Sequence, residues 1–309
     1  MPARPRALLV PVSARAPLID AEMSAGEALR VILLEALAQV NANAPVAVKA
    51  RDGEGLHQLR VGLRRLRTAL TLTDLPGLGA LDARAKAIIN EIGLARDLDV
   101  FVTELFQPAV NELGSRRGFT PLAERTEQLH EHAWTTAIAA IASPEFRTFD
   151  EDVAAAARAI VWPDTASIAT VAPPLLEHAL RRAKKRGRRF QHLDPPARHR
   201  LRIALKKLRY TAEFFAPLYP KKTAKHWLAP LKELQDLLGH LNDVAQVCGV
   251  VERLLADNAG RAAVQADLNH AAGLLQSFHQ ARADALARTT HKQWKAFRET
   301  PPFWTARES

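Results

Sequence analysis

The sequence predicts an all-α protein built from two pseudo-symmetric helical bundles, and three observations support this fold class. The segment His57–Arg67 (HQLRVGLRRLR) recurs as His199–Arg209 (HRLRIALKKLR), displaced by 142 residues. Alanine, leucine and arginine dominate the composition, whereas glycine and β-branched runs are scarce, which favours helix. No segment has the period-two alternation of a half-buried strand. An internal duplication of helical units accounts for all three observations.

The first half is predicted to contain six helices after an irregular leader. Residues 1–22 are rich in proline and are expected to lie outside the fold or along its surface. The first helix begins after Ser24, which forms a capping box with Glu27, and it fades between Asn41 and Pro45. The other helices are expected at 54–75, 81–94, 97–114, 121–142 and 144–161.

The second half is predicted to follow a break at Trp162-Pro163-Asp164 and to begin after Pro173-Pro174. Proline and the residue before it disfavour helix, so we place the boundary between the two halves in this region. The helices of the second half are expected at 174–190, 195–217, 221–238, 242–257, 260–288 and 290–299.

A further repeated pattern follows each basic segment. Lys86–Asp97 corresponds to Lys232–Asp243 at a displacement of 146 residues. Gly93 and Gly239 within these segments are predicted to end a helix, and the aspartate four residues later is predicted to cap the next one. The repeat halves are therefore assigned as 23–161 and 173–299, which form one domain over 23–299 followed by a tail at 300–309.

Positive charge is concentrated in one part of the chain. The protein has a formal net charge of +10 at pH 7. Thirteen Lys and Arg residues but a single acid, Asp194, fall within residues 178–210. The rest of the chain is close to neutral, so the charge is localised and indicates a polyanionic partner.

Each basic segment carries two stripes when it is placed on a helix at 100° per residue. An apolar stripe faces the core and consists of Leu59, Leu63, Leu66 and Leu70 in the first copy and of Leu201, Leu205, Leu208 and Ala212 in the second. Beside it lies the first basic stripe (His57, Arg60, Arg64, Arg67) or the second basic stripe (His199, Arg202, Lys206, Arg209). Like charges at this spacing repel one another, and a bound polyanion converts that repulsion into binding energy.

The type of polyanion is narrowed by what the stripes lack. Proteins that bind single-stranded nucleic acid stack bases on aromatic side chains, and neither stripe contains one. Binding of duplex nucleic acid through phosphates stays open, as does neutralisation of the stripes by acids such as Glu91, Asp97 or Glu233. A polymer that is all phosphate fits the composition best, and the two helices can line a shared channel for it.

The paired H-x-L-R segments resemble those of the CHAD domain, the conserved histidine α-helical domain, over about residues 22–299. Leu94–Val100 (LARDLDV) and Leu238–Asp243 (LGHLND) add to the resemblance. It implies two bundles around a central basic pore that binds inorganic polyphosphate, and association with polyphosphate granules. The family's pore positions carry over to both basic stripes and also to Arg96, Lys184 and Arg188. Residues 1–22 are too few for the triphosphate tunnel hydrolase domain of many relatives, so a stand-alone member is expected.

Catalysis is the alternative reading. Asp97 and Asp99 form a D-x-D pattern that can hold Mg²⁺ beside phosphate, although a helix cap with ion pairs explains it as well. The second copy has Ala245 in place of the second acid. His57 and His199 lack an orienting carboxylate in the sequence pattern, and the other histidines, including His130, His132 and His279, are assigned to the surface. We therefore expect a non-catalytic protein that uses no cofactor or metal.

The remaining features set the cellular context. A single cysteine, Cys248, excludes an internal disulfide and is expected to be buried. No uncharged apolar run approaches the roughly 20 residues that span a bilayer, so a soluble cytoplasmic protein without membrane or nucleic-acid partners is expected. The aromatic pair Phe303-Trp304 is the one hint of a third function, a scaffold that recruits partner proteins. Oligomeric state is not predicted.

Overall fold

The computed structural model describes residues 9–256 and 262–305 and shows an all-α protein within these ranges. The extended pairing described there is one isolated bridge between Ser24 and Ser167. The predicted fold class is therefore confirmed. Side chains at 243–246, 248, 256 and 262–263 are not described, so the predictions for Asp243, Ala245 and Cys248 lie outside the described residues.

The chain divides into two compact units. Unit 1 comprises Met1–Arg96 and Thr135–Ile168, and unit 2 comprises Asp97–Trp134 and Ala169–Ser309. The units do not coincide with the repeat halves, because residues 97–134 group with unit 2. The duplication itself stays a prediction.

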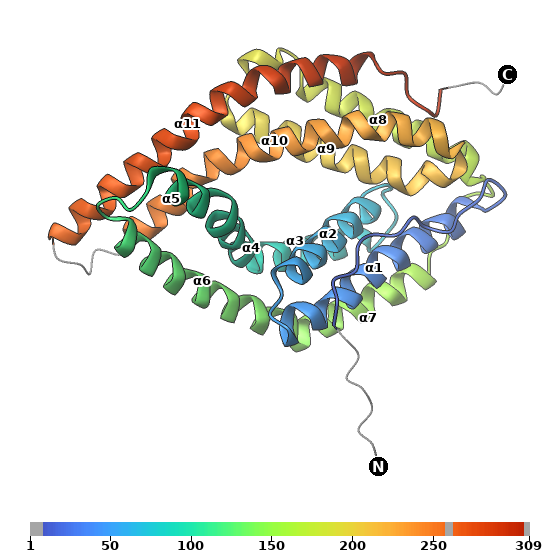
Figure 1. Cartoon of the computed structure of the whole chain (residues 1–309). Helices are drawn as coiled ribbons and strands as arrows, with labels where there is room; N and C mark the ends of the chain where they lie inside the picture. Colours follow the sequence, from blue (N-terminus) through green and yellow to red (C-terminus); the bar gives the residue numbers. More distant parts are fainter. Residues whose placement is uncertain (1–8, 257–261, 306–309) are drawn as a thin grey trace, which may run out of the picture. The chain divides into compact units, whose positions relative to one another are not determined.

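Unit 1 is built around a pair of long helices. Helix α1 (Ala25–Lys49) packs along α2 (Gly53–Leu70), and α7 (Pro144–Arg158) contacts both α1 and α3 (Leu78–Glu91) (Figure 1). The start of α4 (Gly93–Val100) and the end of α6 (Phe119–Ala142) complete the unit.

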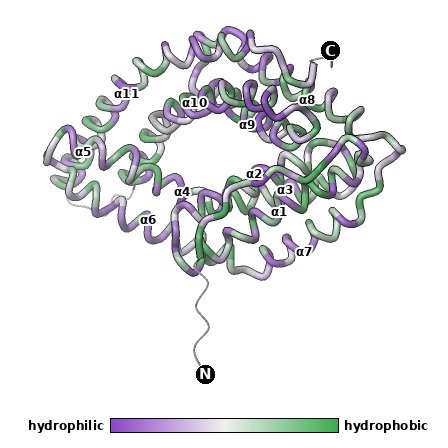
Figure 2. The backbone as a smooth tube through the Cα atoms, turned by 45° about the vertical axis from the view of Figure 1, so that its right-hand side comes forward, coloured by the Kyte–Doolittle hydropathy of each residue, from purple (hydrophilic) through white to green (hydrophobic). Residues whose placement is uncertain are grey.

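Unit 2 is built around α10, which packs against both α9 and α11. Hydrophobic and hydrophilic residues alternate along these helices, as expected for helices that each bury one face (Figure 2). The elements of the unit, besides parts of α4 and α6, are η1 (Phe101–Phe106), α5 (Gln107–Leu113), α8 (Ile168–Arg186), η2 (Phe190–His192), α9 (Pro195–Phe215), η3 (Ala216–Leu218), α10 (Lys221–Ala256) and α11 (Ala262–Glu299).

Helix α1 begins as predicted but continues further than predicted. The capping box is present, with Ser24 and Glu27 bonding to each other's backbone N–H groups. The predicted end near Pro45 is wrong, because α1 runs through the proline to Lys49. Val46 is buried against α2, where Gly55 allows close approach: a Cβ at Gly55 would lie 2.6 Å from a Val46 methyl carbon. Tertiary packing therefore overrides the proline penalty.

Helix α1 also has the length and hydropathy of a membrane span, which differs from the sequence-based expectation. An 18-residue window reaches a mean hydropathy of 1.5, but half of that window is buried inside the fold. The window is not an uncharged run, because Glu35 interrupts it. Its apolar face packs on α2 within unit 1, as in the core helix of a soluble protein.

Three predicted boundaries in the second half are wrong. Helix α8 begins at Ile168 and contains Pro173 and Pro174, which were expected to precede it. Helices α10 and α11 are each continuous where two helices were predicted. In α10 the apolar seam passes through the predicted break, with Leu238 and Leu241 both buried. Burial of that seam outweighs the poor helix propensity of the intervening glycine.

A π-helical segment, η1, separates α4 from α5 in place of one regular helix. Pro108 has no N–H group to bond the carbonyl of Glu104. The Gln107 N–H bonds the Val102 oxygen, five residues earlier, which is the hydrogen-bond pattern of a π-helix. The carbonyl oxygen of Leu105 instead lies 3.0 Å from His279 Nε2. His279 is 3% exposed, so its assignment to the surface is wrong. Burial lowers the pKa of this imidazole, more than its bond to Leu105 raises it, so the neutral ring donates to Leu105.

The first and last described segments of the chain each pack onto one unit. The leader residues from 9 to 20 form no helix or strand and run along unit 1, where Val12 exchanges two 2.9 Å bonds with the Asn43 amide. Arg65, on another face of α2 than the basic stripe, donates to the backbone oxygen of Arg15 at 3.2 Å. In unit 2, Phe303 and Trp304 pack on Trp227, with ring centroids 5.6 and 4.9 Å away. The aromatic tail is buried, which removes the observation that suggested a scaffold function.

Candidate basic binding site

Helices α2 and α9 have the two-stripe geometry that the sequence predicts. The leucines of both apolar stripes, with Ala212, are at most 1% exposed. The basic stripes beside them are half-buried, except for His199, which is exposed. The buried seam fixes the rotation of each helix, and this rotation presents the cations at the edge of the core.

In unit 1, Arg96 joins the first basic stripe. Its Nε lies 3.2 Å from His57 Nδ1 and donates to it. Arginine has no acceptor, so Nδ1 is unprotonated and a neutral His57 carries its hydrogen on Nε2. Arg60 donates from its guanidinium to the carbonyl oxygen of Gly93 at 3.0 Å. Bonds to a ring nitrogen and to a backbone carbonyl orient these two arginines.

Unit 2 repeats this arrangement at the equivalent positions. His199 Nδ1 lies 2.8 Å from the side-chain oxygen of Asn242, which occupies the place of Arg96 in the repeat. Arg202 lies beside Gly239, where a Cβ would be 3.9 Å from its terminal nitrogen; the equivalent distance from Gly93 to Arg60 is 3.7 Å. The recurrence of these local contacts supports the duplication.

The prediction that each glycine marks the end of a helix is confirmed for Gly93, which follows the end of α3 at Glu91 and its C-cap Ile92, and is wrong for Gly239. Gly239 lies inside α10 and does not end a helix, while α4 begins at Gly93 itself, so Asp97 lies within α4 and caps no helix. In both units the glycine lies beside the guanidinium of the basic stripe. A Cβ at either glycine would lie at ordinary van der Waals distance from the arginine, so the contact itself does not require glycine.

The last arginine of each stripe is paired with an acid. Arg67 forms a two-pronged ion pair with Asp82 of α3, at 2.7 and 3.2 Å. Arg209 lies 3.4 Å from Glu213, one turn along α9, and 5.2 Å from the Tyr210 ring centroid. Acids therefore partly neutralise both basic stripes, but these acids are not Glu91 or Glu233. Glu233 instead accepts a hydrogen bond from Gln293. The sequence does not indicate which residues of α3 face α2, so Asp82 could not be predicted as the partner of Arg67.

The remaining predicted residues have different degrees of exposure. Arg64 and Lys206 are half-buried in the middle of α2 and α9. Lys184 is half-buried in the last turn of α8, whereas Arg188 follows that helix and is exposed. Both residues belong to unit 2, at the end of α8 and in the turn that follows it.

The Asp97-x-Asp99 pattern is engaged in a different way from a metal site. Asp99 Oδ1 lies 2.7 Å from His130 Nε2 and 3.0 Å from Trp134 Nε1. His130 is thus a partner of a nearly buried carboxylate, and its assignment to the surface is wrong. Among the residues that the structure describes, no group of three His, Cys, Asp or Glu side chains has metal-binding geometry.

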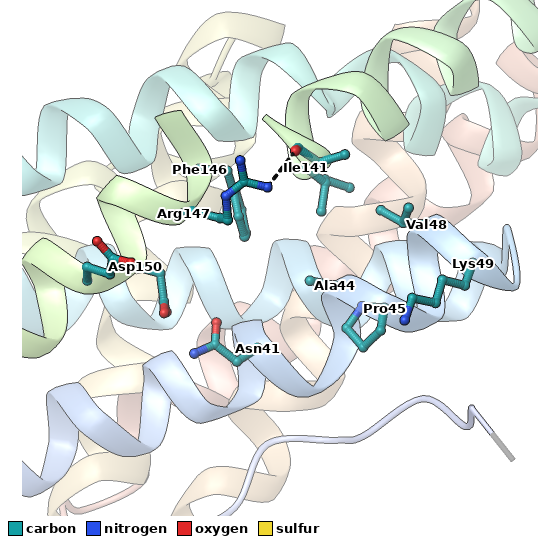
Figure 3. Close-up of a pocket in the computed structure, with 11 residues that line it drawn as sticks. Asn41, Ala44, Pro45, Val48, Lys49, Ile141, Phe146, Arg147 and Asp150 are labelled. Atoms are coloured by element: carbon teal, nitrogen blue, oxygen red, sulfur yellow. Dashed lines mark hydrogen bonds between the residues drawn. The ribbon is translucent and has the colours of Figure 1, made fainter. Parts of the chain in front are cut away.

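Cavities lie elsewhere on both units. In unit 1 a cavity of about 480 Å³ lies between α1 and the junction of α6 and α7 (Figure 3). Phe146 and Ile141 give it apolar walls, while Lys49, Arg147 and Asp150 give its rim both signs of charge. In unit 2, His199 and Asn242 line a recess of about 20 Å³, enough for one water molecule.

Comparisons with known proteins identify the same family as the sequence resemblance. A family model described as the CHAD domain matches residues 31–251. The crystal structure of the CHAD domain from the plant Ricinus communis superposes with a TM-score of 0.77 at 29% identity, covering 91% of this chain and 96% of that one. PptA from Streptomyces chartreusis superposes with a TM-score of 0.68 at 14% identity, covering 88% and 100%. A search of curated protein sequences finds no match.

Proposed function

Because the chain belongs to the CHAD domain family, we propose that it binds inorganic polyphosphate through its two basic stripes and does not process it. The observation that carries this proposal is the repeated geometry on α2 and α9. In each unit a histidine, an arginine held at a glycine and further cations lie beside a fully buried apolar seam. Each stripe can hold successive phosphates of one polymer through charge-assisted bonds.

The first histidine is suited to act as a neutral donor to phosphate. Arg96 donates to Nδ1 of His57, so a neutral ring carries its hydrogen on Nε2 and can act only as a donor there. Arginine guanidinium groups hold phosphate oxygens in two-pronged bonds, and Arg60 and Arg96 are already oriented by neutral groups. Preorganised donors of this kind lower the entropy cost of binding.

The proposal includes the protein's partner and location. Inorganic polyphosphate is the partner, nucleic acid and membranes are not, and the protein acts in the cytoplasm at polyphosphate granules. The experiment measures binding of long-chain polyphosphate and of single-stranded DNA of matched charge across a salt series. We expect tighter binding of polyphosphate at physiological salt, with affinity falling as salt rises. Tighter binding of DNA contradicts the proposal.

The Arg67–Asp82 ion pair gives a prediction about affinity. Substituting Asp82→Asn removes the carboxylate that competes with phosphate for Arg67. We expect polyphosphate affinity to rise by about threefold, while the free energy of unfolding falls by about 1 kcal/mol because the pair is partly exposed. Titration and thermal unfolding measure the two effects. Asp152→Asn on α7, which removes an ion pair with Arg84 of α3, is the matched control and should leave affinity unchanged.

A catalytic function remains the alternative candidate. It would use Asp97 and Asp99 with Mg²⁺, but Asp99 Oδ1 is already bonded to His130 and Trp134. Incubating the protein with polyphosphate and Mg²⁺ and assaying released phosphate decides between the two functions. Release that depends on Asp99 would establish the enzyme, and unchanged polymer length supports the binding protein.

A further inference from the structure

The histidines of the two basic stripes have hydrogen-bond partners of opposite character. In unit 1, His57 Nδ1 accepts from the Nε–H of Arg96 at 3.2 Å. In unit 2, His199 Nδ1 lies 2.8 Å from the side-chain oxygen of Asn242, which occupies the equivalent place on α10. A guanidinium group can only donate hydrogen bonds, whereas an amide oxygen can only accept them. The second copy of the repeat therefore has an acceptor where the first copy has a donor.

This partner decides whether each imidazole can carry a second proton. A protonated imidazole is a donor at both nitrogens. Protonation of His57 would set an N–H group against the Nε–H of Arg96 and one cation beside another, so the contact disfavours the charged ring. His199 can instead donate from Nδ1 to the Asn242 oxygen when its ring is charged. Unit 2 therefore accommodates a charged histidine without the loss of a hydrogen bond.

The same contact determines how His199 can meet phosphate. When the neutral ring donates from Nδ1 to Asn242, its Nε2 has no hydrogen and is an acceptor. The ionised oxygens of polyphosphate are also acceptors, so this neutral ring has no hydrogen bond to offer them. Protonation converts Nε2 into a charged donor, which can form a charge-assisted bond to phosphate. His199 is exposed, so it can become a phosphate ligand in its charged form.

The charged groups around His199 favour protonation only when an anion is bound. Arg198 and Arg202, one and three residues away on α9, are cations that oppose a further positive charge. Asp194, the one acid within residues 178–210, accepts the N-cap bond of α9. The described residues that α10 contributes to the recess at His199 are uncharged: Leu238, Leu241 and Asn242. A polyanion beside the ring reverses this balance, because an opposite charge in contact favours the charged imidazole.

From these contacts we propose that polyphosphate binding protonates His199 and leaves His57 neutral, with Asn242 as the positioning residue that permits the proton uptake. This coupling rests on the proposed function, because the anion that favours the charged ring is the polyphosphate held by the second basic stripe. The protonated protein binds the polymer more tightly than the neutral one. Affinity therefore rises as the pH falls through the range in which imidazole groups titrate, from about pH 8 to pH 5.

The test is isothermal titration of the full-length protein with long-chain polyphosphate, in buffers of different ionisation enthalpy, which measures the protons taken up on binding. We expect uptake of roughly half a proton near pH 7 and an affinity about fivefold higher at pH 6 than at pH 8. His199→Gln should abolish both effects, because glutamine does not titrate, and helicity should be unchanged at this exposed position. His57→Gln is the matched control and should leave the proton uptake unchanged.

Exchanging the two partners tests the role of Asn242 itself. Asn242→Arg gives His199 the partner that His57 has, and we expect the proton uptake to disappear although the substitution adds a positive charge. Arg96→Asn gives His57 the partner that His199 has, and the uptake should become about twice that of the unsubstituted protein. If Asn242 had only a structural role, its substitution would change affinity and leave the proton uptake as it is.

Two results would contradict the proposed coupling while polyphosphate binding itself stands. Binding without proton uptake between about pH 6 and pH 8 would show that His199 does not gain a proton. Uptake that persists in the His199→Gln variant would assign the proton to another group. If polyphosphate fails to bind at either end of this pH range, the proposed function is wrong and the proton coupling is wrong with it.

Discussion

Reversing one charge in each basic stripe, with Arg64→Glu and Lys206→Glu together, is expected to weaken polyphosphate binding by about 100-fold or more. Each substitution removes a charge-assisted contact to phosphate and places a carboxylate in the stripe. Loss of about 1.5 kcal/mol at each stripe already corresponds to a combined factor of about 100. Both residues are half-buried in the middle of their helices, so circular dichroism must show that helicity is retained.

A matched control has the same change in net charge away from the stripes. Lys49 ends α1 in unit 1 and Lys221 begins α10 in unit 2, and both are exposed. Lys49→Glu with Lys221→Glu should leave affinity within about twofold at physiological salt, because exposed charges beyond a Debye length are screened. If the Arg64 and Lys206 variant unfolds, Arg64→Gln with Lys206→Gln tests the same contacts without introducing acids. Normal binding by the glutamine variant would show that the stripes are misassigned.

The helical stripes could be predicted because they depend only on local periodicity. Leu59 and Leu201, with the other seam residues, are fully buried at the spacing that the sequence indicates. Each of the two helices has one rotation about its axis that buries the whole apolar stripe. That rotation also fixes the face on which the cations lie. The same argument gave the capping box at Ser24, which needs only residues three positions apart.

The partners of the stripes could not be predicted, because they come from distant parts of the chain. Asp82 reaches Arg67 from α3, and Arg96 reaches His57 across 39 residues. Their contacts depend on how two helices are placed against each other, which single-sequence periodicity does not contain. The boundaries at Pro45 and Gly239 failed for the same reason, since buried packing decided them over local propensity.

The largest loss of stability is expected for Gly118→Ala in unit 2. Gly118 precedes α6 with a φ of 86°, and a Cβ there would overlap the backbone oxygen of Asp267 in α11. Arg117 also pairs with the Asp267 carboxylate at 2.5 Å, so this turn is held closely against α11. Backbone cannot move aside as a flexible side chain can. We expect the free energy of unfolding to fall by about 3 kcal/mol or more, measured by denaturant titration.

Gly114→Ala separates the strain of the backbone from the clash. Gly114 has a φ of 72° and a ψ of −174°, a region that is essentially restricted to glycine, but no atom lies within 4 Å of its ideal Cβ, so the substitution costs only backbone strain, about 1–3 kcal/mol. Gly77, with a φ of 82° and equally open surroundings, is the corresponding control in unit 1. Gly118→Ala should therefore destabilise the protein clearly more than either. Equal losses at all three glycines would mean that the turn at Gly118 does not pack closely on α11.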